Sequence, residues 1–231
     1  MPTSGTATWN PSILEMLEEA YERAGLQMRT GYDVTTGRRS FNLLMVEFSN
    51  MQLNMWSEED VSLSLVQGTT SYTLAADTID VIDGTIRLNA GNATLQSDLV
   101  ISRQSYSDYI AVPNKLSQGQ PTQYSVQRGT AAPVVYFYPT PDGTQSYTFY
   151  YRRLRRLQDA GTTASTNADT PFRFYDAVIA GLAYRIASKR KESMGLVPQL
   201  KAVYDEALLL AQDEDRDRSS LLICPYITQS F

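Results

Sequence analysis

The sequence predicts an α+β protein: a helical bundle built from N- and C-terminal helices, with an inserted antiparallel β-sandwich or barrel-like domain and an extended C-terminal tail. Three observations carry this prediction. Residues 41–55 place apolar side chains at helical spacing, the period changes to two from residue 61, and helical spacing returns over residues 171–211. With 231 residues, of which 42% are hydrophobic and 19% charged, the chain is long enough for a core of its own.

These changes of period set the expected domain bounds. We expect the helical bundle domain to comprise residues 1–59 and 170–216, and the β domain residues 60–157. A loop over residues 158–169 and a C-terminal extension over residues 217–231 complete the division.

The first helix begins with a capping box, in which Ser12 precedes Glu15 by three residues. Its predicted apolar face consists of Ile13, Leu14, Leu17, Tyr21 and Ala24. Gly25 suits the C-cap. Residues 28–39 contain two glycines and several threonines and predict a loop, and the helix that follows should end near Asn54.

The β domain should begin with a hairpin. Alternation predicts one strand through Val61, Leu63 and Leu65, a turn over residues 67–70, and a return strand that carries Tyr72 and Leu74. In the next strand, Ile82, Ile86 and Leu88 should share one face, with a possible bulge at Gly84.

The rest of the β domain reads as short elements. After a turn at residues 89–92, further strands are expected at residues 98–102, 123–128 and 133–138, and around the alternating Tyr147, Phe149 and Tyr151. A short helix over residues 105–112 should end at Pro113, and a turn is expected at residues 141–143.

Two helices should close the chain. Residues 159–169 are small and polar and predict an exposed loop, after which Thr170 should cap a helix that has Pro171 at its first position. The last helix should start near Pro198. Its predicted inward side chains are Leu200, Val203, Tyr204, Ala207, Leu208 and Ala211.

Several absences limit the chemistry. The chain has no histidine, which removes the commonest general base and metal ligand, and it has no glycine-rich phosphate-binding motif. We therefore predict no enzymatic activity, no cofactor and no metal site. Asp213, Asp215 and Asp217 alternate like a calcium loop, but Arg218 and Cys224 occupy the positions that need glycine and glutamate.

The same composition bears on partners and location. A net charge of −5 lacks the basic signature of a nucleic-acid-binding protein. A single cysteine suits a reducing compartment. We see no membrane span and no export signal, so we expect no membrane partner.

Four arginines, Arg152, Arg153, Arg155 and Arg156, form the one dense basic cluster. They could contact phosphate, or they could pair with acidic side chains of the same or an adjacent subunit. The negative net charge favours ion pairing. We therefore name them as candidates for contacts between subunits, together with the faces of the helices at 12–24 and 171–190.

The tail is unusually apolar for a chain end. Its candidate docking residues are Leu221, Leu222, Ile223, Tyr226, Ile227 and Phe231. Such a segment needs a surface to cover, either on its own domain or on a partner. We favour a partner, with strand addition as one possible mode.

At this point the sequence resembles the head-to-tail adaptor, or connector, proteins of short-tailed bacteriophages. The stretches that carry the likeness are residues 41–87, 101–128, 134–143, 147–161 and 169–190. No single stretch is a catalytic signature, so the specificity lies in their order.

The resemblance implies a structural virion protein. About twelve copies would form a ring beneath the portal protein and above the tail nozzle or tube, extending the channel through which DNA leaves the head. It implies a portal contact by the C-terminal extension and DNA contact only as non-specific passage. The location would be the virion neck or tail, and the host cytoplasm during assembly.

Other functions stay open. The chain could instead be a tail-tube or nozzle subunit, or a stopper protein that completes the head. A carboxylate-based glycosidase and a DNA-binding regulator are disfavoured by the missing acid–base groups and by the charge.

Overall fold

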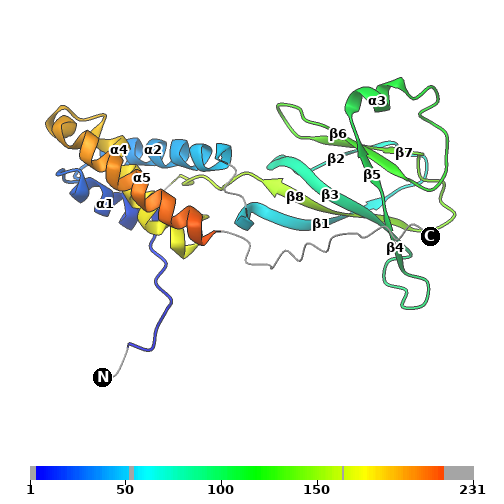
Figure 1. Cartoon of the computed structure of the whole chain (residues 1–231), viewed down its shortest axis with the longest axis horizontal. Helices are drawn as coiled ribbons and strands as arrows, with labels where there is room; N and C mark the ends of the chain where they lie inside the picture. The colour runs from blue at the N-terminus through cyan, green and yellow to red at the C-terminus, as the bar shows by residue number, and fades with distance from the viewer. Residues whose placement is uncertain (1–3, 52–54, 163, 216–231) are drawn as a thin grey trace, which may run out of the picture. The chain divides into compact units, whose positions relative to one another are not determined.

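The computed structural model describes residues 4–51, 55–162 and 164–215. The chain divides into two compact units (Figure 1). A helical unit comprises residues 1–44 and 159–231, and a β unit comprises residues 45–158. The sequence-based bounds at 59/60 and 157/158 stay a prediction.

The α+β class is confirmed. The helices are α1 (Ile13–Arg23), α2 (Gly31–Asn50), α3 (Tyr106–Ala111), α4 (Tyr175–Ala187) and α5 (Val197–Glu214), with short 3₁₀ turns η1 (Met55–Ser57), η2 (Phe172–Phe174) and η3 (Lys191–Leu196). The strands are β1 (Glu58–Leu65), β2 (Ser71–Thr73), β3 (Thr78–Leu88), β4 (Ser97–Val100), β5 (Ser102–Gln104), β6 (Gln123–Gln127), β7 (Val134–Tyr138) and β8 (Tyr147–Arg155).

The N-terminus of α1 is capped as predicted. The Ser12 backbone N–H donates to Glu15 Oε2 at 2.7 Å, and the Glu15 N–H donates to Ser12 Oγ at 3.3 Å. The predicted face is buried except for Leu14, which is half-buried. Ala24 is the C-cap, and Gly25 follows it with φ +70°, the conformation that glycine adopts without strain.

The loop predicted over residues 28–39 is largely wrong, because α2 begins at Gly31. Thr30 and Asp33 cap it reciprocally: the Thr30 N–H donates to Asp33 Oδ2 at 3.1 Å, and the Asp33 N–H to Thr30 Oγ1 at 3.3 Å. Gly37 lies where a Cβ would come within 2.8 Å of Leu17 Cδ2. This glycine marks close helix packing, not a loop. The helix ends at Asn50, and Asn54 lies outside the described residues.

The described residues of the segment 159–169 form no regular element, but they are not simply exposed. Ala160 and Ala164 are fully buried. The N–H groups of Ile13 and Leu14 donate to the carbonyl oxygens of Thr166 and Ala164, each at 2.9 Å. This segment thus supplies acceptors for the first N–H groups of α1, which have no partner within the helix.

Helix α4 is the centre of the helical unit, and nearly all its side chains are buried. Thr170 does not cap it. The chain first makes the η2 turn after Pro171, and Thr170 Oγ1 is buried without a hydrogen-bond partner. Helices from the two ends of the chain pack together here, since α4 contacts both α1 and α5.

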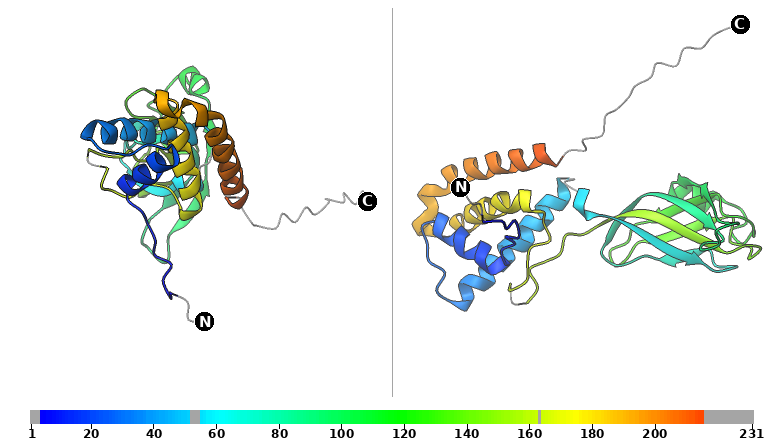
Figure 2. Two further views of the ribbon diagram at one scale, coloured as in Figure 1. Left: turned by 90° about the vertical axis from the view of Figure 1, so that its left-hand side faces the viewer. Right: turned by 90° about the horizontal axis from the view of Figure 1, so that it is seen from below.

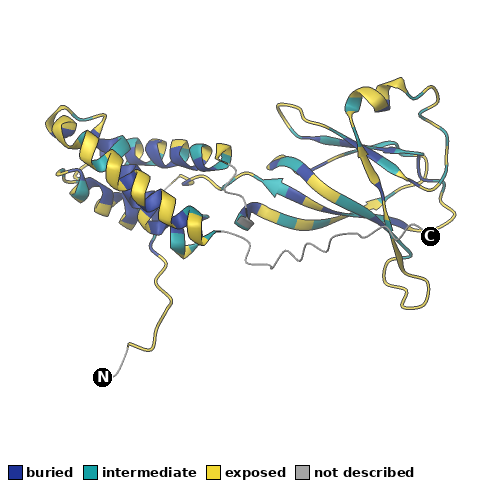
Figure 3. Ribbon diagram, viewed as in Figure 1, coloured by how far each residue is buried: buried dark blue, intermediate teal, exposed yellow. Residues whose placement is uncertain are grey.

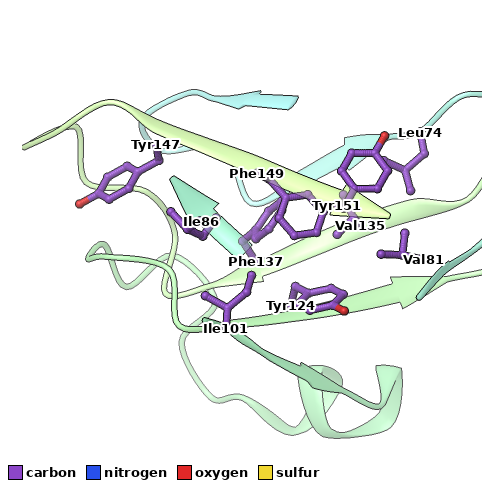
Figure 4. Packing of buried hydrophobic residues seen from close by; sticks show 10 residues of the cluster. All are labelled: Leu74, Val81, Ile86, Ile101, Tyr124, Val135, Phe137, Tyr147, Phe149 and Tyr151. Carbon is purple, nitrogen blue, oxygen red and sulfur yellow. The ribbon is translucent and has the colours of Figure 1, made fainter. Parts of the chain in front are cut away.

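The β unit contains two open four-stranded sheets, and the described strands form no closed barrel. Their orders are β1-β8-β3-β4 and β2-β7-β6-β5. The sheets are antiparallel except for the parallel pair β5 and β6. The chain crosses from one sheet to the other at Ile101. Aromatic and aliphatic side chains of both sheets pack between them, with Phe149 at the centre (Figure 4).

The predicted first hairpin is wrong. The alternation in β1 is confirmed, but its partner is β8, with Glu58 opposite Leu154, whereas β2 joins the other sheet beside β7. The turn at 67–70 therefore carries the chain between sheets. The strands expected near residues 98–102, 123–128, 133–138 and 147–151 are confirmed, as is the short helix after Ser105.

The predicted face of β3 is also corrected. Ile86 is fully buried, but Ile82 is 46% exposed, and Val81 is buried in its place. The register against β8 shifts between Val81 and Asp83, so an extra residue turns Ile82 outward. Gly84 sits beside this bulge, where a Cβ would lie 2.3 Å from Phe149 Cε2.

Candidate interaction surfaces

The predicted arginine cluster lies at the end of β8, where neighbouring strands place acidic residues opposite it. In the sheet register Arg152 faces Asp60 of β1 and Asp83 of β3, and Arg153 faces Glu59 of β1. Cross-strand neighbours are the closest side chains on a sheet face. The local pairing therefore sets oppositely charged groups together before any partner is considered.

Arg153 is the buried member of the cluster. Its Nη2 donates to Glu59 Oε2 at 2.7 Å, and its Nη1 donates to Asp77 Oδ1 at 2.6 Å and to Thr78 Oγ1 at 2.8 Å. Burial opposes the charge of Arg153, but the hydrogen bonds to Asp77 and Glu59 prevail and raise its pKa. The same bond from Arg153 lowers the pKa of Asp77. Arg153 thus joins β8 to β1 and to the start of β3.

The other three arginines differ in exposure. Arg155 Nε lies 2.7 Å from Glu59 Oε1, so Glu59 serves two arginines. The Arg152 side chain is 47% exposed and pairs with Asp60 at 3.1 Å, which raises its pKa. Arg156 is exposed, and its backbone N–H donates to Asp77 O at 2.8 Å. Three of the four arginines therefore form ion pairs with acidic residues of the same chain. Contact of these arginines with another subunit stays a prediction.

The tail begins where α5 ends. Asp215, the C-cap of α5, has a side chain only 3% exposed, and it pairs with Arg173 of η2. This ion pair holds the last turn of α5 against η2. Leu221, Leu222, Ile223, Tyr226, Ile227 and Phe231 lie outside the described residues, so their docking role stays a prediction.

A concave surface of about 560 Å³ lies on the β unit, and sequence reasoning did not find it. Its lining includes Ile82, Asp83, Val100 and Arg103. Strand β4 pairs with β3 only from Thr85 to Leu88, so β4 leaves the first half of β3 uncovered. Arg103 of β5 lies beside this uncovered half of β3, where it donates to the Val81 carbonyl oxygen and to Asp80 Oδ1. The sequence feature that could have indicated this surface was the bulge predicted at Gly84.

Tyrosines gather on α3 and the strand beneath it. The ring centroids of Tyr109 and Tyr136 are 4.8 Å apart, and those of Tyr106 and Tyr136 are 5.4 Å apart. Burial raises the pKa of Tyr109 above its ordinary value. Ile110 and Leu116 are exposed nearby in the chain, at 55% and 73%. Aromatic side chains with a polar end suit interfaces that keep some water.

In the helical unit, exposed positions recur along α2 and α5 (Figure 3), and several of them are apolar. Leu43 of α2 is 55% exposed, and Leu209 and Leu210 of α5 are 58% and 65% exposed. Val203 was predicted to point inward, but it is 42% exposed. Tyr204, Ala207, Leu208 and Ala211 are buried as predicted. The burial of α4 also leaves its face little available to a neighbour.

Two further findings concern the described ranges. Within residues 4–51, 55–162 and 164–215, no three His, Cys, Asp or Glu side chains are grouped so that they could bind a metal ion. The helices in those ranges include none that is long and apolar enough to span a bilayer.

Comparison with known proteins gives one family. The family model described as "SU10 adaptor protein" matches residues 11–223, which takes in α1 through α5 and all eight strands. No curated protein matches the chain.

Proposed function

Because the chain belongs to the SU10 adaptor protein family, a family of structural phage adaptors and not of enzymes, we propose that it is the head-to-tail adaptor of its virion. In this role it joins the portal protein to the tail nozzle or tube. The single observation that carries the proposal is the extent of the family match, which covers residues 11–223 and so includes both compact units.

The adaptor acts as a ring. About twelve copies stand side by side, each using one patch to meet a different patch on the next copy, and the ring continues the DNA-exit channel. The net charge of −5 supports this role, because a wall that neutralised phosphates would retain the DNA it must release. DNA therefore only passes through the channel, and the protein makes no sequence-specific contact with it. The protein acts in the virion neck, and it assembles in the host cytoplasm.

Two sets of residues are proposed to contact partners. The tail, from Leu221 to Phe231, docks onto the portal protein and covers its apolar side chains there. The exposed arginines, Arg152 and Arg156, lie where a neighbouring subunit can reach them. Arg153 and Arg155 contribute indirectly, by holding the strands that present the other two.

The proposal is tested by the mass of the purified full chain, measured by light scattering alone and after mixing with the matching portal ring. The expected result is a monomer alone and about a dozen copies on each portal ring. A chain that ignores the portal but forms rings or tubes by itself would be a tail-tube or nozzle subunit. A single copy or a plug at the portal mouth would make it a stopper protein. Either result would overturn the adaptor assignment.

A further inference from the structure

Helix α4 packs closely against both α2 and α5 at one position. At Gly181 of α4, a Cβ would lie 2.8 Å from Tyr204 Cε2 of α5 and 3.1 Å from Leu44 Cδ1 of α2. Figure 2 shows α2 in blue, α4 in yellow and α5 in orange within this unit. Both helices therefore contribute side chains to this shared core, and their exposed residues point away from it.

The outer face of α2 is apolar and positively charged. Arg39, Leu43 and Val46 are spaced by four and three residues, so they share one helix face, and Leu43 and Val46 are 55% and 56% exposed. Arg39 makes no ion pair with any described residue. Burial, together with the charges of Arg185 and Arg39, lowers the pKa of Lys189, which marks a positive field on this side of the unit.

The outer face of α5 has the complementary character. Val203 and Leu210 are seven residues apart, so they share one helix face, and they are 42% and 65% exposed. Glu206 is exposed between Val203 and Leu210 and makes no ion pair within the described part of the chain. Asp213 follows Glu206 by seven residues on the same side. The outer face of α5 thus carries an apolar row flanked by acidic groups, and the outer face of α2 carries an apolar row with a basic group.

We propose that the outer face of α5 in one copy packs against the outer face of α2 in the next copy, with Glu206 facing Arg39 across the contact. The occupant of each face is therefore a second copy of this chain. Two different patches form a head-to-tail contact, which propagates from copy to copy and closes as a ring when the rotation allows. The inference rests on the proposed function and adds to it the helices and side chains that join the copies.

Complementarity argues for a copy of the same chain over an unrelated partner. Exposed leucines and valines at helical spacing on both faces can interdigitate as ridges in grooves. Each face also presents one charged side chain, Arg39 or Glu206, that forms no ion pair with the residues the structure describes, and the two charges are opposite. A contact between two α2 faces, or between two α5 faces, would set like charges together.

Cross-linking in the full chain tests the proposal. In a Cys224→Ser background, Leu43→Cys and Val203→Cys are combined, and a short bismaleimide is added to the assembled complex with the portal ring. The expected product is a ladder of dimers, trimers and longer chains, because each copy carries both ends of the contact. The two single-cysteine variants, mixed, should give one linked pair and no ladder. A matched control combines Glu18→Cys of α1 with Val203→Cys and should give no ladder.

The outcomes separate the two proposals. If the parent chain assembles on the portal and the double-cysteine variant, with unchanged unfolding midpoint, gives no ladder, the α2–α5 contact is wrong and the adaptor function stands. A ladder equally strong from the Glu18 control would also overturn the specific pairing. If the parent chain does not join the portal, the adaptor function fails. In that case the α2–α5 contact is tested by cross-linking the protein alone. A ladder of linked copies supports the contact, and the lack of a ladder overturns it.

Discussion

The β unit and the helical unit use their charged side chains differently. In the β unit, Arg153 and Arg155 of β8 share Glu59 of β1 at 2.7 Å each, and Arg153 also binds Asp77. In the helical unit, Arg39 lies on the exposed side of α2 and Glu206 on that of α5, and neither forms an ion pair within the described chain. The comparison teaches that a dense basic cluster can serve to stabilise the fold through ion pairs within the chain. Single unpaired charges beside exposed leucines, in contrast, indicate a surface that binds a partner.

Each unit carries its own reporter, which makes the comparison measurable. Trp9 packs edge-on against Tyr175 of α4 in the helical unit, with ring centroids 5.7 Å apart, and Trp56 belongs to the β unit. The chain has two tryptophans, so Trp9→Phe and Trp56→Phe give proteins that report on one unit each. All unfolding experiments below use these two backgrounds.

The largest effect is expected from Gly84→Val in β3. The new Cβ would lie 2.3 Å from Phe149 Cε2, and Phe149 fills the centre of the β core. We expect the β unit to lose about 3 kcal/mol of unfolding free energy, because overpacking displaces both the ring and the strand. Urea unfolding followed through Trp56 measures this loss.

Gly129→Val is the matched control for that substitution. At Gly129 a Cβ meets only Ala132 O, at 3.6 Å, so little change is expected. Equal losses at both positions would show that Gly84 is not a site of close approach.

The next effect breaks the arginine network. Arg153→Gln removes the charge that Asp77 and Glu59 face; it leaves Asp77 without its main partner and Glu59 with Arg155 alone. We expect a loss of about 2 kcal/mol in the β unit, discounted because the two acids are nearly half exposed. Arg152→Gln, at an exposed position, should leave the midpoint unchanged. If the Arg153 variant unfolds like the parent, the network does not reinforce the β unit.

The helical unit is tested by Gly181→Val. Its side chain would enter the space between Tyr204 of α5 and Leu44 of α2, and we expect a loss of about 2 kcal/mol seen through Trp9. Gly195→Val, where a Cβ meets nothing within 4 Å, is the control. A loss seen only through Trp56 would contradict the assignment of this crossing to the helical unit.

A smaller effect is expected with acid. Hydrogen bonds from the Thr30 hydroxyl, then from the N–H groups of Arg29 and Thr30, lower the pKa of Asp33, and the bond from Arg153 lowers that of Asp77. A lowered folded pKa contributes stability that is complete above the ordinary value of 3.8 and is lost as the pH falls through the folded value.

This gives each unit its own acid-sensitive carboxylate. Between about pH 5 and about pH 3, Asp33→Asn should flatten the loss of stability seen through Trp9, and Asp77→Asn the loss seen through Trp56. If either variant changes the unfolding followed through Trp9 and through Trp56 equally, the two carboxylates do not act on separate units.

The smallest effect on folding is expected from Arg156→Glu. This exposed side chain follows β8 and should leave both unfolding traces unchanged. If the β unit also contributes to the contact between subunits, fewer copies should join the portal ring at low salt than for the parent. Unchanged occupancy would confine the contact to the helical unit.

Local signals in the sequence were sufficient for much of the fold. The Ser12 capping box, the alternation in β1 and the short helix after Ser105 depend on near neighbours, and they were predicted correctly. The partner of β1 could not be predicted, because Glu58 pairs with Leu154 almost a hundred residues away. Gly37 suggested a loop because glycine has no side chain, and only the packed Leu17 shows why a helix needs it there.

The candidate surfaces were harder to predict for the same reason. The arginines are plain in the sequence, but their acids come from β1 and from the start of β3, which the expected hairpin placed elsewhere. Val203 has helical spacing with buried residues and still lies on the outer side of α5, because α5 contacts its unit along a narrow face. Spacing identifies which residues share a face but not how wide the covered part is.

The most direct test of where copies meet is an exchange of charge across the proposed contact. The number of copies bound to the matching portal ring would be measured by light scattering for Arg39→Glu, for Glu206→Arg and for the double variant. We predict that each single variant lowers the occupancy and that the double variant restores it, since the pair is again opposite in charge. Single variants that bind as fully as the parent, or a double variant as weak as either single one, would contradict the claim that α2 and α5 join neighbouring copies.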